Sequence, residues 1–106
     1  MSESKRDHAK EAKEVFEGGA TRSELALRYD LVPRAAVEGI ARRLTLGVEK
    51  HGEWNWKNGG PAFVKSTKNH LMKHVLNYLE TGEPADLDAI GANYALLADF
   101  RERGIV

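Results

Sequence analysis

The sequence predicts an all-α fold, a compact bundle of four to five helices in one domain that spans residues 1–106. Every strong hydrophobic periodicity in the chain has helical spacing, and no segment shows the apolar–polar alternation of a strand. Glycine and proline residues stand where one helix would end and the next begin. A chain of 106 residues is long enough for a modest core and too short for two domains.

The first predicted helix is charged and weakly amphipathic. It spans Ser4–Glu17, within a charged N-terminal segment of residues 1–20. The pair Gly18-Gly19 ends it, because glycine takes the left-handed cap conformation at little cost. A capping-box pattern then opens a short second helix, Thr21–Tyr29.

Three longer helices are predicted after residue 32. The first begins at Pro33, where a first-turn proline fits, and ends at Gly52. The second spans Phe63–Thr81 and the third begins near Asp86. Each carries apolar residues at core spacing, which we expect to point inward: Val37, Ile40, Ala41, Leu44 and Val48; Val64, Leu71, Val75 and Leu79; Leu87, Ile90, Tyr94 and Leu97.

Composition excludes several classes of protein. Sixteen basic residues balance sixteen acidic ones, whereas a dedicated nucleic-acid binder usually has a basic surplus. The absence of cysteine excludes disulfides, thiolate metal sites and thiol nucleophiles. No apolar run approaches a membrane span and no signal peptide is recognisable, so we expect a soluble, cytoplasmic protein. A net charge near zero also favours self-association.

The loop predicted over Gly52–Ala62 contains both tryptophans of the chain, Trp54 and Trp56, on either side of Asn55. An indole is costly to leave in water, so each tryptophan either anchors the loop or contacts a flat partner. We expect Trp56 to be packed and Trp54 to be exposed or to touch a ligand.

Charge is segregated along the second half of the chain. Residues 54–79 contain four lysines and two histidines and no acidic residue, and residues 80–88 contain four acidic residues and no basic one. This pattern suits a polyphosphate bound with a divalent ion, since carboxylates hold the ion and lysines neutralise the phosphates. The alternative is that Asp86 and Asp88 complement a helix N-terminus while the lysines form a solvated face.

Other polar residues are candidates for the same site. Glu38 and Glu49 share a helix face but lie roughly 16 Å apart, so at most one of them joins a metal site with the acidic cluster; otherwise Glu38 pairs with Arg42. His70 and His74 have zinc-compatible spacing without an obvious third ligand, so we expect one of them to contact a phosphate or a carboxylate.

The segment Ala20–Arg43 also fits a helix-turn-helix. It contains two predicted helices around a turn, with several arginines placed to contact phosphates. The second helix, however, presents Ala35, Ala36 and Glu38, which read bases poorly. A small DNA-binding or protein-interaction module, for instance a phage regulatory protein without catalysis, is therefore the alternative function.

Four blocks together resemble a known family: RYDLVP at 28–33, LTLGVEKHG at 44–52, the pair Asn55-Trp56, and HLMKHVLNYLETGE at 70–83. They are similar to the N-terminal domain family of phage and bacterial dATP/dGTP diphosphohydrolases, over residues 27–100. The resemblance implies a MazG-like all-α enzyme that cleaves purine deoxynucleoside triphosphates to the monophosphate and pyrophosphate. It also implies that carboxylates on facing helices hold Mg²⁺ or Mn²⁺. We expect the chain to form a homo-oligomer, a dimer.

The resemblance supports Lys50, Asn55, Trp56, His74, Glu83 and Asn93 as site residues. Combined with the charge pattern, it gives three sets of expected roles. The catalytic set is Glu83, Asp86 and His74; the substrate-binding set is Lys50, Trp54, Asn55, Trp56, Lys73 and Asn93; the metal-binding set is Glu38, Glu49, Glu83, Asp86 and Asp88.

The chain departs from the family pattern at three places. His51 replaces a tyrosine, Lys73 replaces an arginine, and the linker before the last helix is shortened to EPADLD. That linker normally brings polar residues to the site. Either Asp86 or Asp88 substitutes for them, or the chain binds nucleotide without turning it over.

Overall fold

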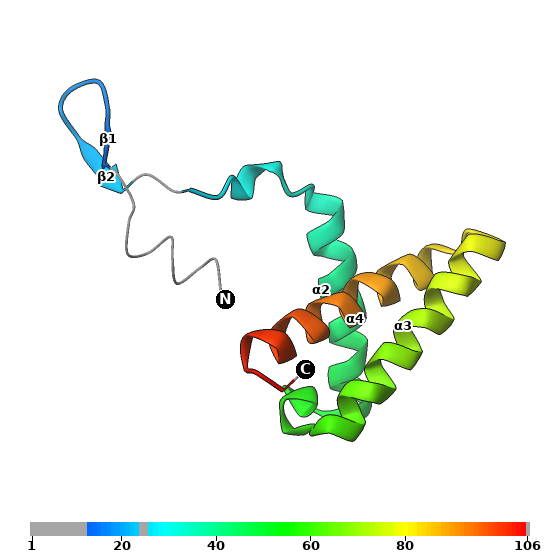
Figure 1. Ribbon diagram of the computed structural model, residues 1–106. Coiled ribbons are helices and arrows are strands. Elements are labelled where there is room, and N and C mark those ends of the chain that lie inside the picture. Colours follow the sequence, from blue (N-terminus) through cyan, green and yellow to red (C-terminus); the bar gives the residue numbers. More distant parts are fainter. Residues whose placement is uncertain (1–12, 24–25, 106) are drawn as a thin grey trace. The chain divides into compact units, whose positions relative to one another are not determined.

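The computed structural model describes residues 13–23 and 26–105 and divides the chain into two compact units, Met1–Val32 and Pro33–Val106. The described part of the first unit holds a two-stranded sheet and a 3₁₀ turn; that of the second holds three α-helices and another 3₁₀ turn (Figure 1). In chain order the elements are β1 (Lys13–Val15), β2 (Thr21–Ser23), η1 (Tyr29–Leu31), α2 (Arg34–His51), η2 (Asn55–Asn58), α3 (Pro61–Thr81) and α4 (Pro84–Glu102).

The mostly helical fold is thus confirmed, but the four to five helices are not. The helix predicted over Ser4–Glu17 is wrong from residue 13 onward, where β1 pairs antiparallel with β2; the rest of it lies outside the described residues. The physical reason is the pair Gly18-Gly19, with φ angles of 91° and 90°. Positive φ at consecutive residues suits a hairpin turn, so the glycines turn the chain back on itself instead of capping a helix.

The short helix predicted over Thr21–Tyr29 is also wrong in its described part. β2 occupies its beginning, and the tight turn η1 begins where the helix should end. A bidentate pair between Arg28 and Asp30, with Nη2 and Oδ2 2.6 Å apart, holds two side chains that are only two residues apart and favours a turn. The helix-turn-helix prediction loses its first helix with this correction.

The three long helices agree with the sequence within about two residues. Gly52 and Gly82 cap α2 and α3 with φ angles of 90° and 70°. Pro33 is the N-cap residue of α2 and not part of its first turn. Pro61 and Pro84 open α3 and α4, where a missing N–H costs nothing.

The core lies where α4 packs against both α2 and α3 (Figure 1). Its buried apolar residues in the described part are few: Val64, Ala89, Ala92 and Phe100. Glycines bring α2 and α4 close together. A Cβ on Gly39 would meet Asp88 Oδ1 at 2.6 Å, and one on Gly91 would meet Ile40 Cγ1 at 3.0 Å.

Several residues expected to point inward are exposed, because small side chains make the helix contacts. The exposed fractions are 54% for Val37, 42% for Val48, 76% for Leu79, 50% for Leu87 and 64% for Tyr94. Ala41 is exposed as well. None of the helices in the described ranges is long and apolar enough to cross a membrane.

Candidate functional site

An open groove of about 1130 Å³ lies in the helical unit. The second half of α2 and the loop after it form one wall, α3 forms the other, and α4 contributes Ala92, Asn93 and Leu96. The groove exists because α2 and α3 each pack chiefly on α4 and leave space between them.

Helical spacing brings basic side chains into this groove. Arg43 and Lys50 are seven residues apart on α2, which places them on one face. His70, Lys73 and His74 are one turn apart on α3 and line the opposite wall. Both walls therefore present cations to the same space.

The loop between α2 and α3 supplies the aromatic end of the groove. Trp54 has a φ of 57°, in the left-handed region that non-glycine residues rarely adopt, and its side chain is 61% exposed. Lys57 Nζ lies 4.2 Å from the centroid of the Trp54 ring, a cation–π contact. Trp56 is half-buried and packs edge-on against Phe100, with ring centroids 6.3 Å apart. The packing of Trp56 and the exposure of Trp54 are as the sequence predicts.

His74 is buried, with 8% of its surface exposed, and its Nδ1 lies 2.7 Å from Asp86 Oδ1. A carboxylate accepts hydrogen bonds, so Nδ1 carries a proton and donates it to Asp86. The second ring nitrogen, Nε2, is then free to accept a proton or, in the charged ring, to donate to a phosphate oxygen. Since His74 also lines the groove, Asp86 acts as its positioning residue.

Asn93 stands on the α4 side of the groove. Its amide Nδ2 donates to the carbonyl oxygen of Ala89 at 2.8 Å, which fixes the orientation of the side chain. The amide oxygen is an acceptor that this bond leaves unused.

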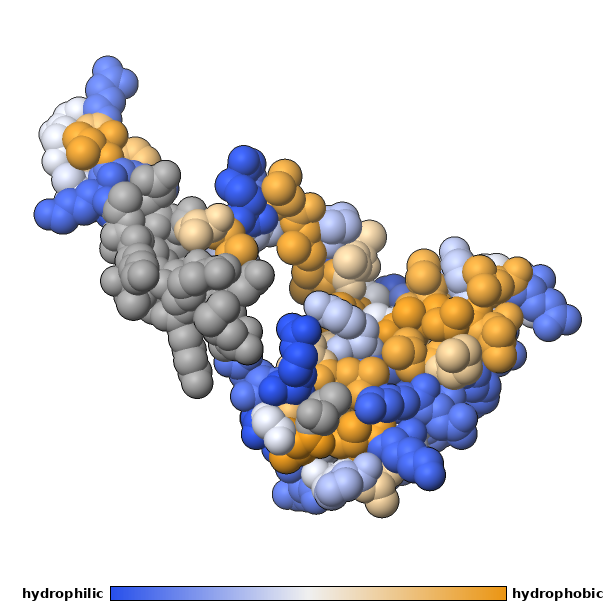
Figure 2. Space-filling view, viewed as in Figure 1, coloured by the Kyte–Doolittle hydropathy of each residue, from blue (hydrophilic) through white to orange (hydrophobic). Residues whose placement is uncertain are grey.

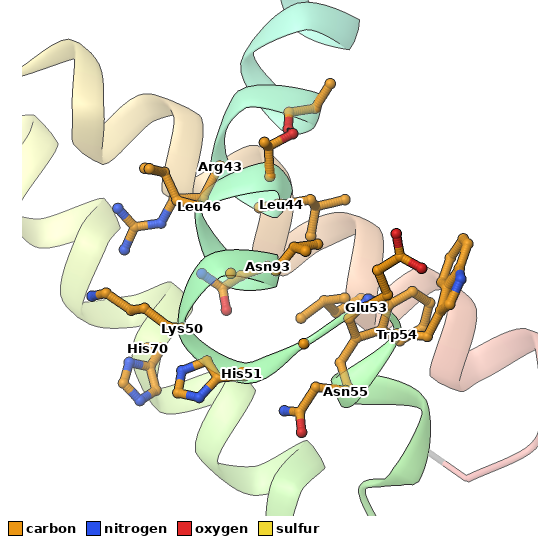
Figure 3. A pocket seen from close by; sticks show the side chains of 18 of the residues that line it. Arg43, Leu44, Leu46, Lys50, His51, Glu53, Trp54, Asn55, His70 and Asn93 are labelled. Atoms are coloured by element: carbon orange, nitrogen blue, oxygen red, sulfur yellow. The ribbon is translucent and has the colours of Figure 1, made fainter.

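The groove is strongly asymmetric in charge. Glu53 is the single acidic residue among the residues that line it. The lining also includes three permanent cations, Arg43, Lys50 and Lys73, and three histidines, His51, His70 and His74. In Figure 3, Lys50, His51 and His70 gather toward one end while Trp54 and Glu53 lie toward the other, with Asn93 between them. One end of the groove suits an anion, and the other carries an exposed aromatic ring.

All six predicted substrate-binding residues, together with His74, line the groove. The carboxylates predicted to hold metal do not. Asp88 forms a bidentate pair with Arg42, at 2.7 Å and 3.2 Å, which lowers the pKa of Asp88 through the hydrogen bonds and the guanidinium charge. Asp86 lies behind His74.

The remaining predicted carboxylates lie on the surface. Glu38 forms an ion pair with Arg34, whose Nε lies 3.4 Å from Glu38 Oε1, so its partner on the helix is not the expected Arg42. Glu49 and Glu83 are exposed. Within residues 13–23 and 26–105, no group of three or more His, Asp or Glu side chains is placed to hold a metal ion. The described carboxylates therefore do not fit a metal cluster within one chain.

Sequence reasoning missed three ionisable lining residues as members of this site: Arg43, His51 and Glu53. The seven-residue spacing of Arg43 to Lys50 was the available signal for the first. The side of the helix that faces the groove follows from where α3 diverges from α2, which the sequence does not reveal.

A comparison with protein-family models matches residues 17–104 to the family described as dATP/dGTP diphosphohydrolase, N-terminal. The match covers most of the chain, including every residue that lines the groove. The chain belongs to this family. Comparisons with curated proteins and with solved structures found no match.

Family membership confirms the resemblance that the four sequence blocks indicate. The match extends beyond residues 27–100 and takes in the hairpin turn as well as all three helices. It relates the chain to nucleotide chemistry, and the family description refers to an N-terminal domain.

Proposed function

We propose that the groove binds a purine deoxynucleoside triphosphate, with the phosphates toward the basic end and the base toward Trp54. The observation that carries this proposal is the composition of the groove, six basic or imidazole side chains against one carboxylate, in a chain of zero net charge. A triphosphate is the anionic part of the substrates in the family's description, and cations neutralise its oxygens.

The residues divide by role in this proposal. Lys50 and Lys73 approach the phosphates from opposite walls, and His74, held by Asp86, donates to or accepts from the reacting phosphate. Asn55 and Asn93 supply hydrogen bonds to the sugar or base. The exposed surface of the Trp54 indole contacts the base, while Lys57 lies over the ring.

Hydrolysis to the monophosphate and pyrophosphate is the reaction we propose for the assembled enzyme, with Mg²⁺ or Mn²⁺ entering as the counter-ion of the triphosphate. We propose no metal cluster within the described residues of one chain, since its carboxylates do not converge. A homo-oligomer belongs to the same proposal.

Titration calorimetry with dGTP, dATP, dCTP and dTTP, each with Mg²⁺ and with EDTA, tests the binding step. We expect the two purine nucleotides to bind more tightly than the pyrimidines, and to bind in EDTA as well, because the groove's own cations neutralise the phosphates. Absence of any heat with all four nucleotides would remove the proposal.

A pyrophosphate-release assay on the same samples tests the reaction separately. Turnover that requires Mg²⁺ or Mn²⁺ would support the enzyme. Binding without turnover would leave nucleotide binding as the function of this chain and would contradict hydrolysis by it alone.

A further inference from the structure

The outward face of α4 carries apolar residues that the helical unit leaves partly or largely uncovered: Leu87 and Tyr94 are exposed, and Ile90 and Leu97 are half-buried. Residues 89–98 contain no charged side chain, and a helix that is apolar all round is normally buried on every side. Ala92 faces the core with 4% of its surface exposed, whereas Leu87 and Tyr94, on the opposite side of the helix, are 50% and 64% exposed. Figure 2 shows hydrophobic side chains gathered over the α3–α4 end of this unit.

This outward face is a single stripe with charged ends, which we call the α4 stripe. At 100° per residue, all of its members fall within about 40° of one line along the helix. From the N-terminal end to the C-terminal end they are Glu83, Leu87, Ile90, Tyr94, Leu97 and Arg101. An acidic residue stands at the first end and a basic residue at the last.

The order of residues in the α4 stripe makes it self-complementary. Suppose that two copies of α4 pack antiparallel and cross at the level of Ala92. Each residue of the stripe then faces the partner residue that lies equally far from position 92 on the other side. Leu87 then faces Leu97 of the partner subunit, and Ile90 faces Tyr94 of the partner subunit. Glu83 faces Arg101 of the partner subunit, so opposite charges close both ends of an apolar seam.

We infer that the α4 stripe is the contact surface of an antiparallel, two-fold symmetric dimer of this chain. A two-fold interface must be complementary to itself, and few helix faces meet that condition in both hydropathy and charge. The opposite-charge ends fix the register, because a parallel arrangement would place like charges together and a shifted antiparallel one would separate the opposite charges. The chain's net charge of zero also allows the two copies to approach.

The flanking surface of α3 adds to the same contact. Met72, Leu76 and Leu79, spaced at four and three residues along α3, are 58%, 58% and 76% exposed. A second copy seated on α4 would cover part of this surface, whereas Lys50 and Lys73 in the groove would stay open to nucleotide. The dimer therefore does not depend on what the groove binds.

Sedimentation equilibrium of the full chain, over a range of concentrations, tests the inference by a charge exchange. Glu83→Arg and Arg101→Glu each place like charges at both ends of the seam. We expect each to raise the dimer dissociation constant at least about tenfold. The double variant restores opposite charges in the reverse order, and should return the constant to within about threefold of the wild-type value.

Leu87→Glu tests the apolar part of the seam, with Val37→Glu on α2 as the control, since Val37 is equally exposed at 54%. We expect Leu87→Glu to give monomers and Val37→Glu to leave the dimer intact, both with unchanged helical circular dichroism. A monomeric wild type would overturn the inference, as would a dimer that ignores all three α4 substitutions or a double variant as weak as the single ones.

Discussion

Trp54 combines two features that are individually costly. Its backbone is in the left-handed region, with a φ of 57°, and its indole is 61% exposed. Such conformations cost on the order of 1–3 kcal/mol and concentrate at binding sites. Lys57 lies over the ring and Trp56 packs against it at an angle of 63°, and the ring surface that stays exposed is available to a planar ligand.

Replacing Trp54 with alanine is expected to weaken dGTP binding about tenfold, because stacking of a base on an aromatic ring contributes about 1–3 kcal/mol. The melting temperature should change little. Trp54→Phe keeps an aromatic face and should retain most of the affinity. Calorimetry and thermal melting of both variants check this, and equal affinity of Trp54→Ala and wild type would rule out stacking at this residue.

Trp56→Ala should have the opposite profile. Its ring packs against Phe100 in the core, so truncation is expected to lower the free energy of unfolding by about 2–3 kcal/mol. Urea denaturation measures this directly. A stable Trp56→Ala protein that binds nucleotide poorly would reverse the roles assigned to the two tryptophans.

Gly39 shows how one missing side chain sets a helix contact. A Cβ at this position would lie 2.6 Å from Asp88 Oδ1, and Arg42 holds that carboxylate in place. We expect Gly39→Ala to destabilise the fold by about 1–3 kcal/mol. Gly47→Ala on the same helix has nothing within 4 Å of the added Cβ and should stabilise by about 0.5–1 kcal/mol. Similar denaturation midpoints for the two variants would contradict the close contact of α2 with α4.

At the scale of the elements, the Arg42–Asp88 pair is the hydrogen-bonded link between α2 and α4. It lowers the pKa of Asp88, so its contribution to stability is fully present above the ordinary aspartate pKa of about 4. That contribution is lost as the pH falls through the lower pKa of the folded state, because the unfolded chain then binds its proton first.

The melting temperature of Asp88→Asn should therefore be below that of the wild type at pH 6, and the difference should shrink as the pH falls below about 4. Glu38→Gln, which removes an exposed pair within one helix, serves as the control and should have a smaller effect at pH 6. A difference between wild type and Asp88→Asn that does not change with pH would contradict the ionic link.

The sequence predicted the long helices well because their signals are local. Apolar periodicity, opening prolines and closing glycines all act within a few residues, and the bounds of α3 differ by two residues at most from those expected. The N-terminal predictions failed because the same glycines that end a helix also turn a hairpin. Deciding between those two uses requires the pairing of Lys13–Val15 with Thr21–Ser23, which is not visible in either segment alone.

At the scale of the whole molecule, the groove assembles residues from three helices and a loop that lie up to fifty-five positions apart, Ala41 to Leu96. The groove position of the residues predicted to bind substrate could be anticipated because most of them belong to family blocks or to basic spacing on single helices. The predicted metal ligands were chosen by their charge and, for Glu83, by the family resemblance as well. In the structure Asp88 pairs with Arg42 and Asp86 pairs with His74. The sequence indicated that His70 or His74 would contact a phosphate or a carboxylate, but it gave no sign of the Arg42–Asp88 pair.

The central claim is that the groove's basic end holds the phosphates of a purine deoxynucleoside triphosphate. Titration calorimetry of dGTP into Lys50→Ala/Lys73→Ala tests it most directly, with Lys65→Ala/Lys68→Ala as the control, since those two lysines lie on α3 outside the groove. The groove variant should bind at least about a hundredfold more weakly than the wild type, because each charged hydrogen bond contributes about 1.5–3 kcal/mol. The control, with the same change in net charge, should lose less than about threefold; equal losses in the two double variants would contradict the claim.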